Sequence, residues 1–331
     1  MPKKVLVKDI LDFINSFAPF NSAEDFDNVG LLVGNKNAEV KKVLVCLDCT
    51  DEIISEAIDL GANLVITHHP VIFSPLKKMV SDSIVYRLVQ NSISVISAHT
   101  NLDIAPMGVA DSLAEKMELK NIQPFALGNV ESYYKLSVLG QEKAVLDVKT
   151  AFLPYISEYF EDNGSFCGYF SENILQDVLN ISTSLDKNSQ IKIDITKSEI
   201  KNRNKYYGRV GVLPKEMTAR EFALYTKEKL GTSSLQFVNT AKKIKTAAIV
   251  GGSGGSFMFD AINSGADAFV TGDIKHNVWL DAKSFGLCLV DAGHFQTEIM
   301  IVPALKNILE NHFGEGLFFA SETEKSPFEF I

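Results

Sequence analysis

The stretch AIDLGANLVIT, residues 57–67, decides the fold class, because it joins the end of a helix to a strand through a glycine. Glycine at position 61 is the residue type that most often ends a helix. The strand NLVIT (63–67) is apolar throughout, as strands of a parallel sheet are when helices cover both faces. Another apolar strand, KVLVCLD (42–48), precedes the helix. The stretch therefore predicts a strand–helix–strand unit of an α/β fold.

The same pattern continues on both sides of this unit. SDSIVYRLVQN (81–91) predicts a helix, and ISVIS (93–97) predicts a further strand. Towards the N-terminus, residues 7–17 carry apolar side chains at helical spacing, and LLVG (31–34) predicts a short strand. Helices that alternate with apolar strands in this way predict a doubly wound α/β region.

A second copy of the unit is visible further along the chain. AINSGADAFVT (261–271) matches the opening stretch at Ala, Ile, Gly, Ala and Thr, and the register holds without a gap back to Lys42 against Thr246. ISVISAHTNLD (93–103) likewise parallels LCLVDAGHFQTE (287–298) with one added residue. We interpret this as an internal duplication that gives two similar α/β halves around a shared crevice, although the general strand–helix pattern of such folds would produce part of the similarity.

Composition changes between the two halves. YYKLSVLG (133–140) and QIKIDITK (190–197) alternate apolar and polar residues, as antiparallel strands with one solvent-facing side do. KAVLDVKTAFLPYISEYF (143–160) and SENILQDVLN (171–180) are read as helices. We therefore expect a small α+β insertion at 129–206, between core segments at 1–128 and 207–331.

The second half is expected to open with the helix MTAREFALYTKEKLG, residues 217–231. Thr218 is the predicted N-cap, and Glu221 completes a capping box three residues later. Gly231 stands at the predicted C-terminus.

Histidines and carboxylates gather where the predicted strands end, which is the edge at which open α/β sheets bind ligands. They are the pair His68 and His69, the spacing His99-x-x-x-Asp103, and the spacing His294-x-x-x-Glu298. Imidazole and carboxylate without thiolate suit Zn, Mn, Fe, Co or Ni. Five ligands with shared carboxylates are too many for one open tetrahedral site and fit two neighbouring divalent ions better. Each pattern alone is more often structural, and an i,i+4 His–Glu pair is routine on a helix.

Three further motifs leave alternatives open. GGSGGS (251–256) fits a tight turn as well as an anion-binding loop, and it is neither a dinucleotide fingerprint nor a P-loop. TGDIKHN (271–277) offers Asp273 and His276, either behind the ligands or simply at a helix start, which we favour. Cys46 and Cys49 form a C-x-x-C without a second one to complete a zinc site, so buried strand cysteine is the preferred interpretation over redox or zinc chemistry.

Composition excludes several classes of protein. The net charge is −9 with no Lys/Arg stripe, which argues against non-specific nucleic-acid binding. The chain has no signal-peptide pattern and no apolar run of membrane-spanning length. Four cysteines in 331 residues form no disulfide framework, so a cytoplasmic location is expected.

The ordered motifs resemble the Nif-three-like family, whose members are also named GTP cyclohydrolase I type 2 homologs. The matching motifs are EDFDNVGLLVG (24–34), LVITHHPVIF (64–73), AHTNLD (98–103), GGSGGS, VTGDIKH (270–276) and VDAGHFQTE (290–298). The resemblance covers about 1–128 and 207–331. It departs from the family at Phe26, where Trp is usual, and in the insertion, which is shorter than the ferredoxin-fold insert of larger members.

The resemblance implies a dinuclear metal site formed by His68, His69, Asp103, His294 and Glu298. It places His99 behind these ligands, since the family motif coordinates through the aspartate. It also implies a homo-oligomer, a hexameric toroid, and attack on the imidazole ring of GTP. We therefore expect a metal-dependent hydrolase acting on a nucleotide or a related small molecule, with His99 or His276 passing protons. The alternative is a non-enzymatic metal-binding or protein-interaction assembly.

Overall fold

The computed structural model describes residues 4–128, 133–156, 158–171, 174–185, 191–198 and 205–329. The chain forms two compact units, a core of 1–127 with 206–331 and a small unit of 128–205. The predicted start of the insertion at 129, like Gln190 of the strand QIKIDITK, lies outside the described residues.

The first half of the core is built on a five-stranded sheet in the order β1-β4-β3-β2-β15. β4, β3, β2 and β15 run parallel to one another, and the edge strand β1 pairs with β4 antiparallel. The strands are β1 (Gly30–Val33), β2 (Val43–Cys46), β3 (Leu64–Thr67), β4 (Ser94–Ser97) and β15 (Phe318–Ala320). The parallel strands predicted from the apolar runs are confirmed.

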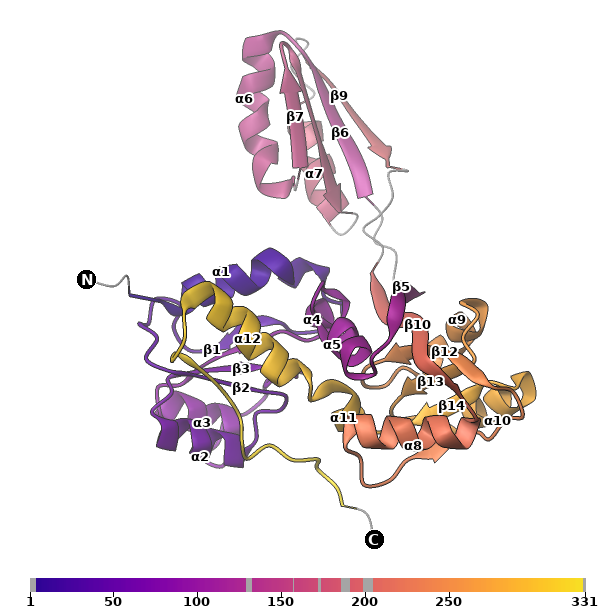
Figure 1. Cartoon of the computed structure of the whole chain (residues 1–331). Coiled ribbons are helices and arrows are strands. Elements are labelled where there is room, and N and C mark those ends of the chain that lie inside the picture. The colour runs from indigo at the N-terminus through magenta and orange to yellow at the C-terminus, as the bar shows by residue number, and fades with distance from the viewer. Residues whose placement is uncertain are drawn as a thin grey trace. The chain divides into compact units, whose positions relative to one another are not determined.

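Helices cover both faces of this sheet (Figure 1). Val43 and Val45 of β2 pack in the core on the side of α1 (Val7–Phe17) and α12 (Ile301–Phe313). Leu44 and Cys46 pack in the core on the opposite side, with α2 (Asp51–Leu60) and α3 (Ile84–Gln90). A strand that is buried on both faces explains why its sequence is apolar without alternation.

The second half is built on a six-stranded sheet in the order β11-β14-β13-β12-β10-β5. β12, β13 and β14 are parallel, whereas β11, β10 and β5 pair antiparallel with their neighbours. The strands are β5 (Lys120–Leu127), β10 (Tyr206–Met217), β11 (Gln236–Phe237), β12 (Ile244–Val250), β13 (Ala268–Thr271) and β14 (Cys288–Asp291).

The helices of the second half again lie on both faces of the sheet. The core on one face includes residues of α5 (Val109–Lys116) and α8 (Ala219–Leu230), and the core on the other includes residues of α9 (Met258–Asn263) and α10 (His276–Phe285). The predicted cap of α8 is confirmed: Thr218 and Glu221 form the capping box, and Gly231 ends the helix in the left-handed conformation.

The halves exchange elements across the core. β15, together with α12, comes from the C-terminal part of the chain but completes the first half. α5 and β5 precede the small unit but complete the second half. Both halves share three parallel strands followed by an antiparallel edge strand, β2-β3-β4-β1 and β12-β13-β14-β11. This shared order supports the duplication, which stays a prediction.

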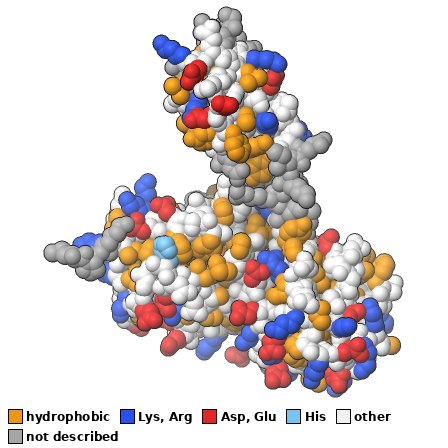
Figure 2. All heavy atoms as spheres, turned by 45° about the horizontal axis from the view of Figure 1, so that its top comes forward, with side chains coloured by type: hydrophobic (Ala, Val, Ile, Leu, Met, Phe, Trp, Pro, Cys, Tyr) orange, Lys and Arg blue, Asp and Glu red, His pale blue; other side chains and the backbone are white. Residues whose placement is uncertain are grey.

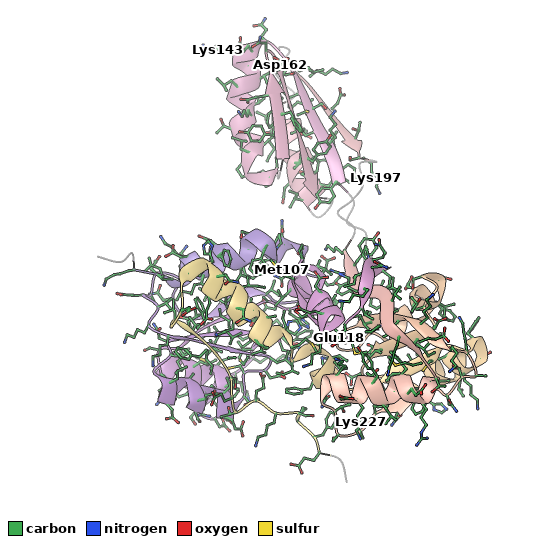
Figure 3. All side chains as sticks on the ribbon, in the orientation of Figure 1. Met107, Glu118, Lys143, Asp162, Lys197 and Lys227 are labelled. Carbon is green, nitrogen blue, oxygen red and sulfur yellow. The ribbon has the colours of Figure 1, made fainter. Side chains whose placement is uncertain are left out.

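The small unit has the order of elements β-α-β-β-α-β and one antiparallel sheet, β7-β8-β6-β9, which is a ferredoxin-like arrangement. Its elements are β6 (Tyr133–Gly140), α6 (Glu142–Phe152), β7 (Glu158–Asp162), β8 (Ser165–Ser171), α7 (Leu175–Leu185) and β9 (Ile191–Lys197). Figure 3 labels Lys143 and Asp162 at one end of this unit and Lys197 at the other.

The helix predicted over 143–160 was wrong in its second part. α6 ends at Phe152, the residues Leu153–Tyr155 form a 3₁₀ turn that contains Pro154, and the chain then enters β7. Proline lacks the N–H that helix continuation needs and clashes with the preceding turn, so it ends the helix. The α+β character of the segment is confirmed by its sheet and helices.

The surface carries both charges. On the face shown in Figure 2, Lys and Arg side chains are interspersed with Asp and Glu side chains. Among the helices of the described ranges, none is long and apolar enough to cross a membrane.

Candidate metal centre

The histidine pair lies directly after β3, where the backbone is still bonded to the end of β2. The N–H of His68 donates to the carbonyl of Cys46 (3.1 Å), and that of His69 donates to the carbonyl of Leu47 (2.9 Å). The two imidazole rings lie 5.0 Å apart, so both side chains belong to one cluster.

His68 is buried, with only 1% of its side chain exposed. Its Nδ1 donates to the carbonyl of Ala98 (2.9 Å), because a carbonyl oxygen can only accept. Nε2 is buried and has no hydrogen-bond partner. It lies 3.4 Å from Oδ1 of Asp103 and 4.0 Å from Oε1 of Glu298. The Nε2 atom of His68 thus faces two carboxylates without a hydrogen bond to either.

His69 is held from one side by a carboxylate. Its Nδ1 donates to Oδ1 of Asp48 (2.8 Å), and its Nε2 lies 3.1 Å from Oε2 of Glu298. Burial disfavours the charged ring, but the hydrogen bonds to Asp48 and Glu298 outweigh burial and raise the pKa of His69 to about 10.

The second half contributes α11 (His294–Glu298), a short helix whose first and last residues lie on one face. Nε2 of His294 lies 3.1 Å from Oε2 of Glu298. Nδ1 of His294 donates to Oδ2 of Asp273 (2.7 Å). Hydrogen bonding to Glu298 raises the pKa of His294 to about 9. Burial opposes ionisation of Glu298, but His294 and His69 outweigh it and hold the pKa of Glu298 well below its usual range.

The first half adds a third strand end, at α4 (Thr100–Ile104), which carries Asp103. His99 precedes this helix, and its Nδ1 donates to Oδ1 of Asp27 (2.9 Å). The Asp27 side chain is fully buried and also accepts from the N–H (3.0 Å) and the hydroxyl (2.5 Å) of Thr100. Burial acts against ionisation, but His99 and Thr100 outweigh it and lower the pKa of Asp27 to about 2.

The structure brings all five predicted ligands together, with ligand atoms within 4.8 Å inside each group of three. The groups are His68–His69–His99, His69–His294–Glu298 and His68–Asp103–Glu298. His99 therefore lies within the cluster, whereas His276 is exposed as the first residue of α10. Asp273 accepts a hydrogen bond from His294 and so lies behind the cluster. His276, the other candidate in TGDIKHN, only starts a helix.

Two residues of the site were missed from the sequence, Asp27 and Asp48. The sequence carries a signal for each of them: Asp48 follows an apolar strand as His68 does, and Asp27 is part of EDFDNVG. His69, His99 and His294 each donate Nδ1–H to a carboxylate, and His68 donates to a carbonyl. Partners of this kind fix the tautomer of metal-binding histidines and leave Nε2 as the atom that can bind metal.

The donor set fits divalent transition metals. Imidazole nitrogens and carboxylate oxygens suit Zn, Mn, Fe, Co or Ni. A buried imidazole nitrogen without a partner, as in His68, is costly unless a cation or a proton occupies the space beside it. The residues His68, His69, His99, Asp103, His294 and Glu298 could therefore hold metal.

GGSGGS is packed against this cluster as a turn. The N–H of Gly252 donates to the hydroxyl of Thr297 (3.0 Å), and the N–H of Gly254 donates to the hydroxyl of Thr271 (2.8 Å). These N–H groups are used within the protein, which favours the tight turn over an anion site. An added β-carbon at Gly252 would lie 3.2 Å from Nε2 of His294, so the turn borders the ligands closely.

A cleft of about 1050 Å³ opens beside the cluster. Asp48 and His69 line it, together with the start of α2 and residues 322–327, but none of the other candidate ligands does. The cleft thus reaches the cluster on the side of His69 only.

An α/β core whose strand ends collect imidazoles and carboxylates defines a candidate metal-binding protein. The chain matches the family model of Duf34/NIF3 (NGG1p interacting factor 3) over residues 5–327, and it belongs to this family.

Similar proteins match this chain along nearly the whole length of both sequences. The chain is 33% identical over 366 aligned positions to a GTP cyclohydrolase 1 type 2 homolog of Staphylococcus epidermidis, covering 98% of this chain and 99% of that protein. It is 34% identical over 371 positions to the homolog of Staphylococcus aureus, covering 98% and 100%. Among solved structures, Staphylococcus aureus protein SA1388 aligns with a TM-score of 0.80 at 32% identity, covering 99% of both chains. A Bacillus cereus protein related to NIF3 aligns with a TM-score of 0.77 at 28% identity, covering 99% and 100%.

Proposed function

We propose that the protein is a metal-dependent hydrolase that holds two divalent ions and acts on a nucleotide or a related small molecule. The proposed ligands are His68, His69, Asp103, His294 and Glu298. The observation that carries the proposal is the buried Nε2 of His68, which has no hydrogen-bond partner and faces Asp103 and Glu298.

Charge supports two ions over one. Five carboxylates, those of Asp27, Asp48, Asp103, Asp273 and Glu298, lie against four imidazoles. Histidines bind metal in the neutral form, so the cluster would carry five negative charges, which two divalent ions nearly offset. Glu298 also belongs to two of the groups of three ligands, as a carboxylate shared between two ions would.

Metal binding and proton transfer are assigned to different residues of the chain. Divalent ions held here would activate water as a nucleophile and offset negative charge that develops on the substrate. His99 keeps its Nδ1 on Asp27, which fixes the tautomer and leaves Nε2 to accept or donate a proton. Exposed His276 has no such placement, so His99 is the proposed proton carrier of the two.

The substrate class comes from the relatives, which are named GTP cyclohydrolase 1 type 2 homologs. GTP is therefore the first substrate to test, together with other phosphoesters and cyclic amidines, which the same chemistry could attack.

The test loads the purified protein with Mn²⁺, Zn²⁺, Fe²⁺ or Co²⁺ and offers GTP and a panel of phosphoesters, with Glu298→Ala as the matched variant. We expect turnover that needs metal and is lost in Glu298→Ala. The enzyme proposal fails if no substrate turns over and Glu298→Ala binds metal like the unaltered protein.

A second candidate is a non-enzymatic interaction protein, which the family name, an interacting factor, and an exposed apolar surface favour. Phe26 and Phe73 are 65% and 54% exposed with ring centroids 6.5 Å apart, and Leu76, Met79 and Val80 are also exposed. Capture of a defined partner that survives replacement of all five ligands would favour this candidate over the hydrolase.

We also propose that the protein assembles as a homohexamer in the cytoplasm. All four cysteines are free, as expected in a reducing compartment. Light scattering of the purified protein should give six times the 36.5 kDa chain mass; a monomer or dimer at micromolar concentration would contradict the assembly.

A further inference from the structure

The chain after β15 is fastened to the first half by polar contacts. In Figure 1 this yellow segment leaves the sheet and runs past α2 towards the C-terminus. The N–H of Ser321 donates to the carbonyl of Val45 (2.8 Å). Glu56 of α2 accepts hydrogen bonds from the hydroxyl of Ser321 (2.6 Å), the N–H of Glu322 (2.8 Å) and the hydroxyl of Thr323 (2.6 Å). The segment is therefore held in one place beside α2.

Its next residue, Glu324, binds the backbone at the end of β2. Oε1 of Glu324 accepts from the N–H of Leu47 (2.7 Å) and from the N–H of Asp48 (2.7 Å). Oε2 accepts from the N–H of Leu47 as well (2.9 Å). These contacts fix the peptide from which the Asp48 side chain extends.

Asp48 in turn holds His69. Its Oδ1 accepts from Nδ1 of His69 at 2.8 Å, which leaves Nε2 of that ring turned towards Glu298 at 3.1 Å. A continuous set of hydrogen bonds thus leads from the C-terminal segment, through Asp48, to a proposed metal ligand.

The ionised form of Glu324 is disfavoured where this side chain lies. Burial raises the pKa of Glu324 and the neighbouring Asp48 carboxylate acts in the same direction, and together they outweigh the backbone hydrogen bonds from Leu47 and Asp48, which act to lower it. A like charge beside a carboxylate disfavours its ionised form, so the contact with Asp48 alone does not account for the placement of Glu324. Its contacts lead instead to Asp48, which holds the proposed metal ligand His69.

We propose that Glu324 is a positioning residue for the metal centre, which orients His69 by fixing the backbone of Leu47 and Asp48. The inference rests on the proposed dinuclear site. It assigns to the C-terminal segment, more than 250 residues from the histidine pair, a role in metal binding. Groups that orient metal ligands typically change metal affinity about 10–100-fold when removed.

A glutamine at position 324 tests the hydrogen bonds of Glu324 apart from its negative charge. Oε1 alone accepts from both N–H groups, so the carbonyl oxygen of glutamine can keep these two bonds, and only the additional bond from the N–H of Leu47 to Oε2 is lost. Glu324→Gln should therefore retain most of the metal affinity, whereas Glu324→Ala should weaken metal binding. Exposed Glu322, whose backbone rather than side chain reaches Glu56, supplies the control Glu322→Ala in the same segment.

The experiment titrates Co²⁺ into the full-length ion-free protein and its variants, reading the visible d–d spectrum and the dissociation constant. We expect Glu324→Ala to weaken binding about 10–100-fold and to alter the spectrum, while Glu324→Gln stays within about threefold and Glu322→Ala within about twofold. Asp48→Ala should reproduce the loss, and adding Glu324→Ala to it should cost nothing more, because both act through His69.

Two results would overturn the inference: equal binding by Glu324→Ala and the unaltered protein, or additive losses in the double variant. If Glu324→Ala does not fold, the comparison of Glu324→Gln with Asp48→Ala and Asp48→Asn decides, since loss in Glu324→Gln equal to that in Asp48→Ala contradicts a hydrogen-bonding role. Failure of the proposed function is a separate result, in which Glu298→Ala binds Co²⁺ as the unaltered protein does.

Discussion

Gly252 and Glu298 lie so close that a β-carbon added at position 252 would overlap Oε1 of the glutamate. Gly252 also has a positive φ of 60°, which disfavours residues with a β-carbon. The turn GGSGGS therefore has two reasons for a glycine at this place, its backbone conformation and the space that a proposed metal ligand occupies.

The Gly252→Ala variant should displace Glu298 and weaken metal binding by about tenfold or more. The left-handed backbone should also cost about 1–2 kcal/mol of stability. Gly265→Ala is the matched control, because Gly265 has a φ of 80° and no atom within 4 Å of an added β-carbon. Metal titration and urea unfolding should show similar destabilisation in both variants but weaker binding only in Gly252→Ala. Equal metal affinities would contradict the role assigned to this contact.

His99 and His276 should differ in their effect on stability. His99→Ala removes a donor from the fully buried Asp27, and an underpaired buried carboxylate costs about 1–3 kcal/mol or more. His276 is exposed, so His276→Ala should stay within about 0.5 kcal/mol. Urea unfolding of the ion-free proteins, followed by the fluorescence of Trp279, the single tryptophan, measures both changes. If His276→Ala were as destabilised as His99→Ala, the loss of the hydrogen bond to Asp27 would not explain the lower stability of His99→Ala.

The cysteines of the C-x-x-C should be unreactive near neutral pH. Burial raises the pKa of Cys49 to about 12 and raises that of Cys46 well above its usual value. The thiolate is the nucleophile, so alkylation of Cys49 at pH 8 should be at least ~100-fold slower than in the urea-unfolded chain. Because the pKa is raised, the rate should still climb tenfold per pH unit between pH 8 and 10.

Peptide mass spectrometry after iodoacetamide treatment gives the rates for each cysteine. Labelling of Cys49 in the folded protein at the unfolded rate would revive the redox interpretation of this motif.

Local signals in the sequence were sufficient for much of the core. Gly61 ends α2 in the left-handed conformation, as its type and place indicated, and the side chain of Thr50 caps the other end of that helix. These features are decided by a few neighbouring residues. The pairing of β15 with β2 had no such signal, because a three-residue strand at the end of the chain is placed only by the packing of distant elements.

In the candidate site, too, some residues have a local signal in the sequence and others have none. His68, His69, Asp103, His294 and Glu298 could be gathered because each follows a predicted strand, and strand ends of a parallel sheet share an edge. Asp48 carries the same signal, but its sequence context does not distinguish a carboxylate that orients His69 from one that faces solvent. Glu324 had no signal at all, since its partners are the backbone N–H groups of Leu47 and Asp48.

The small unit should unfold separately from the core, because it has a hydrophobic core of its own in which Phe152 is fully buried. Phe152→Ala should destabilise that unit by about 3–5 kcal/mol through lost burial and the cavity left behind. Leu146→Ala, at a 60% exposed position of the same helix, should have little effect. Cys167 of β8 reports on the small unit by alkylation, and Trp279 reports on the core by fluorescence. In Phe152→Ala, Cys167 should become reactive at lower urea while the Trp279 transition stays in place. If both transitions move together, the two units unfold as one, and the separation inferred from their distinct cores is wrong.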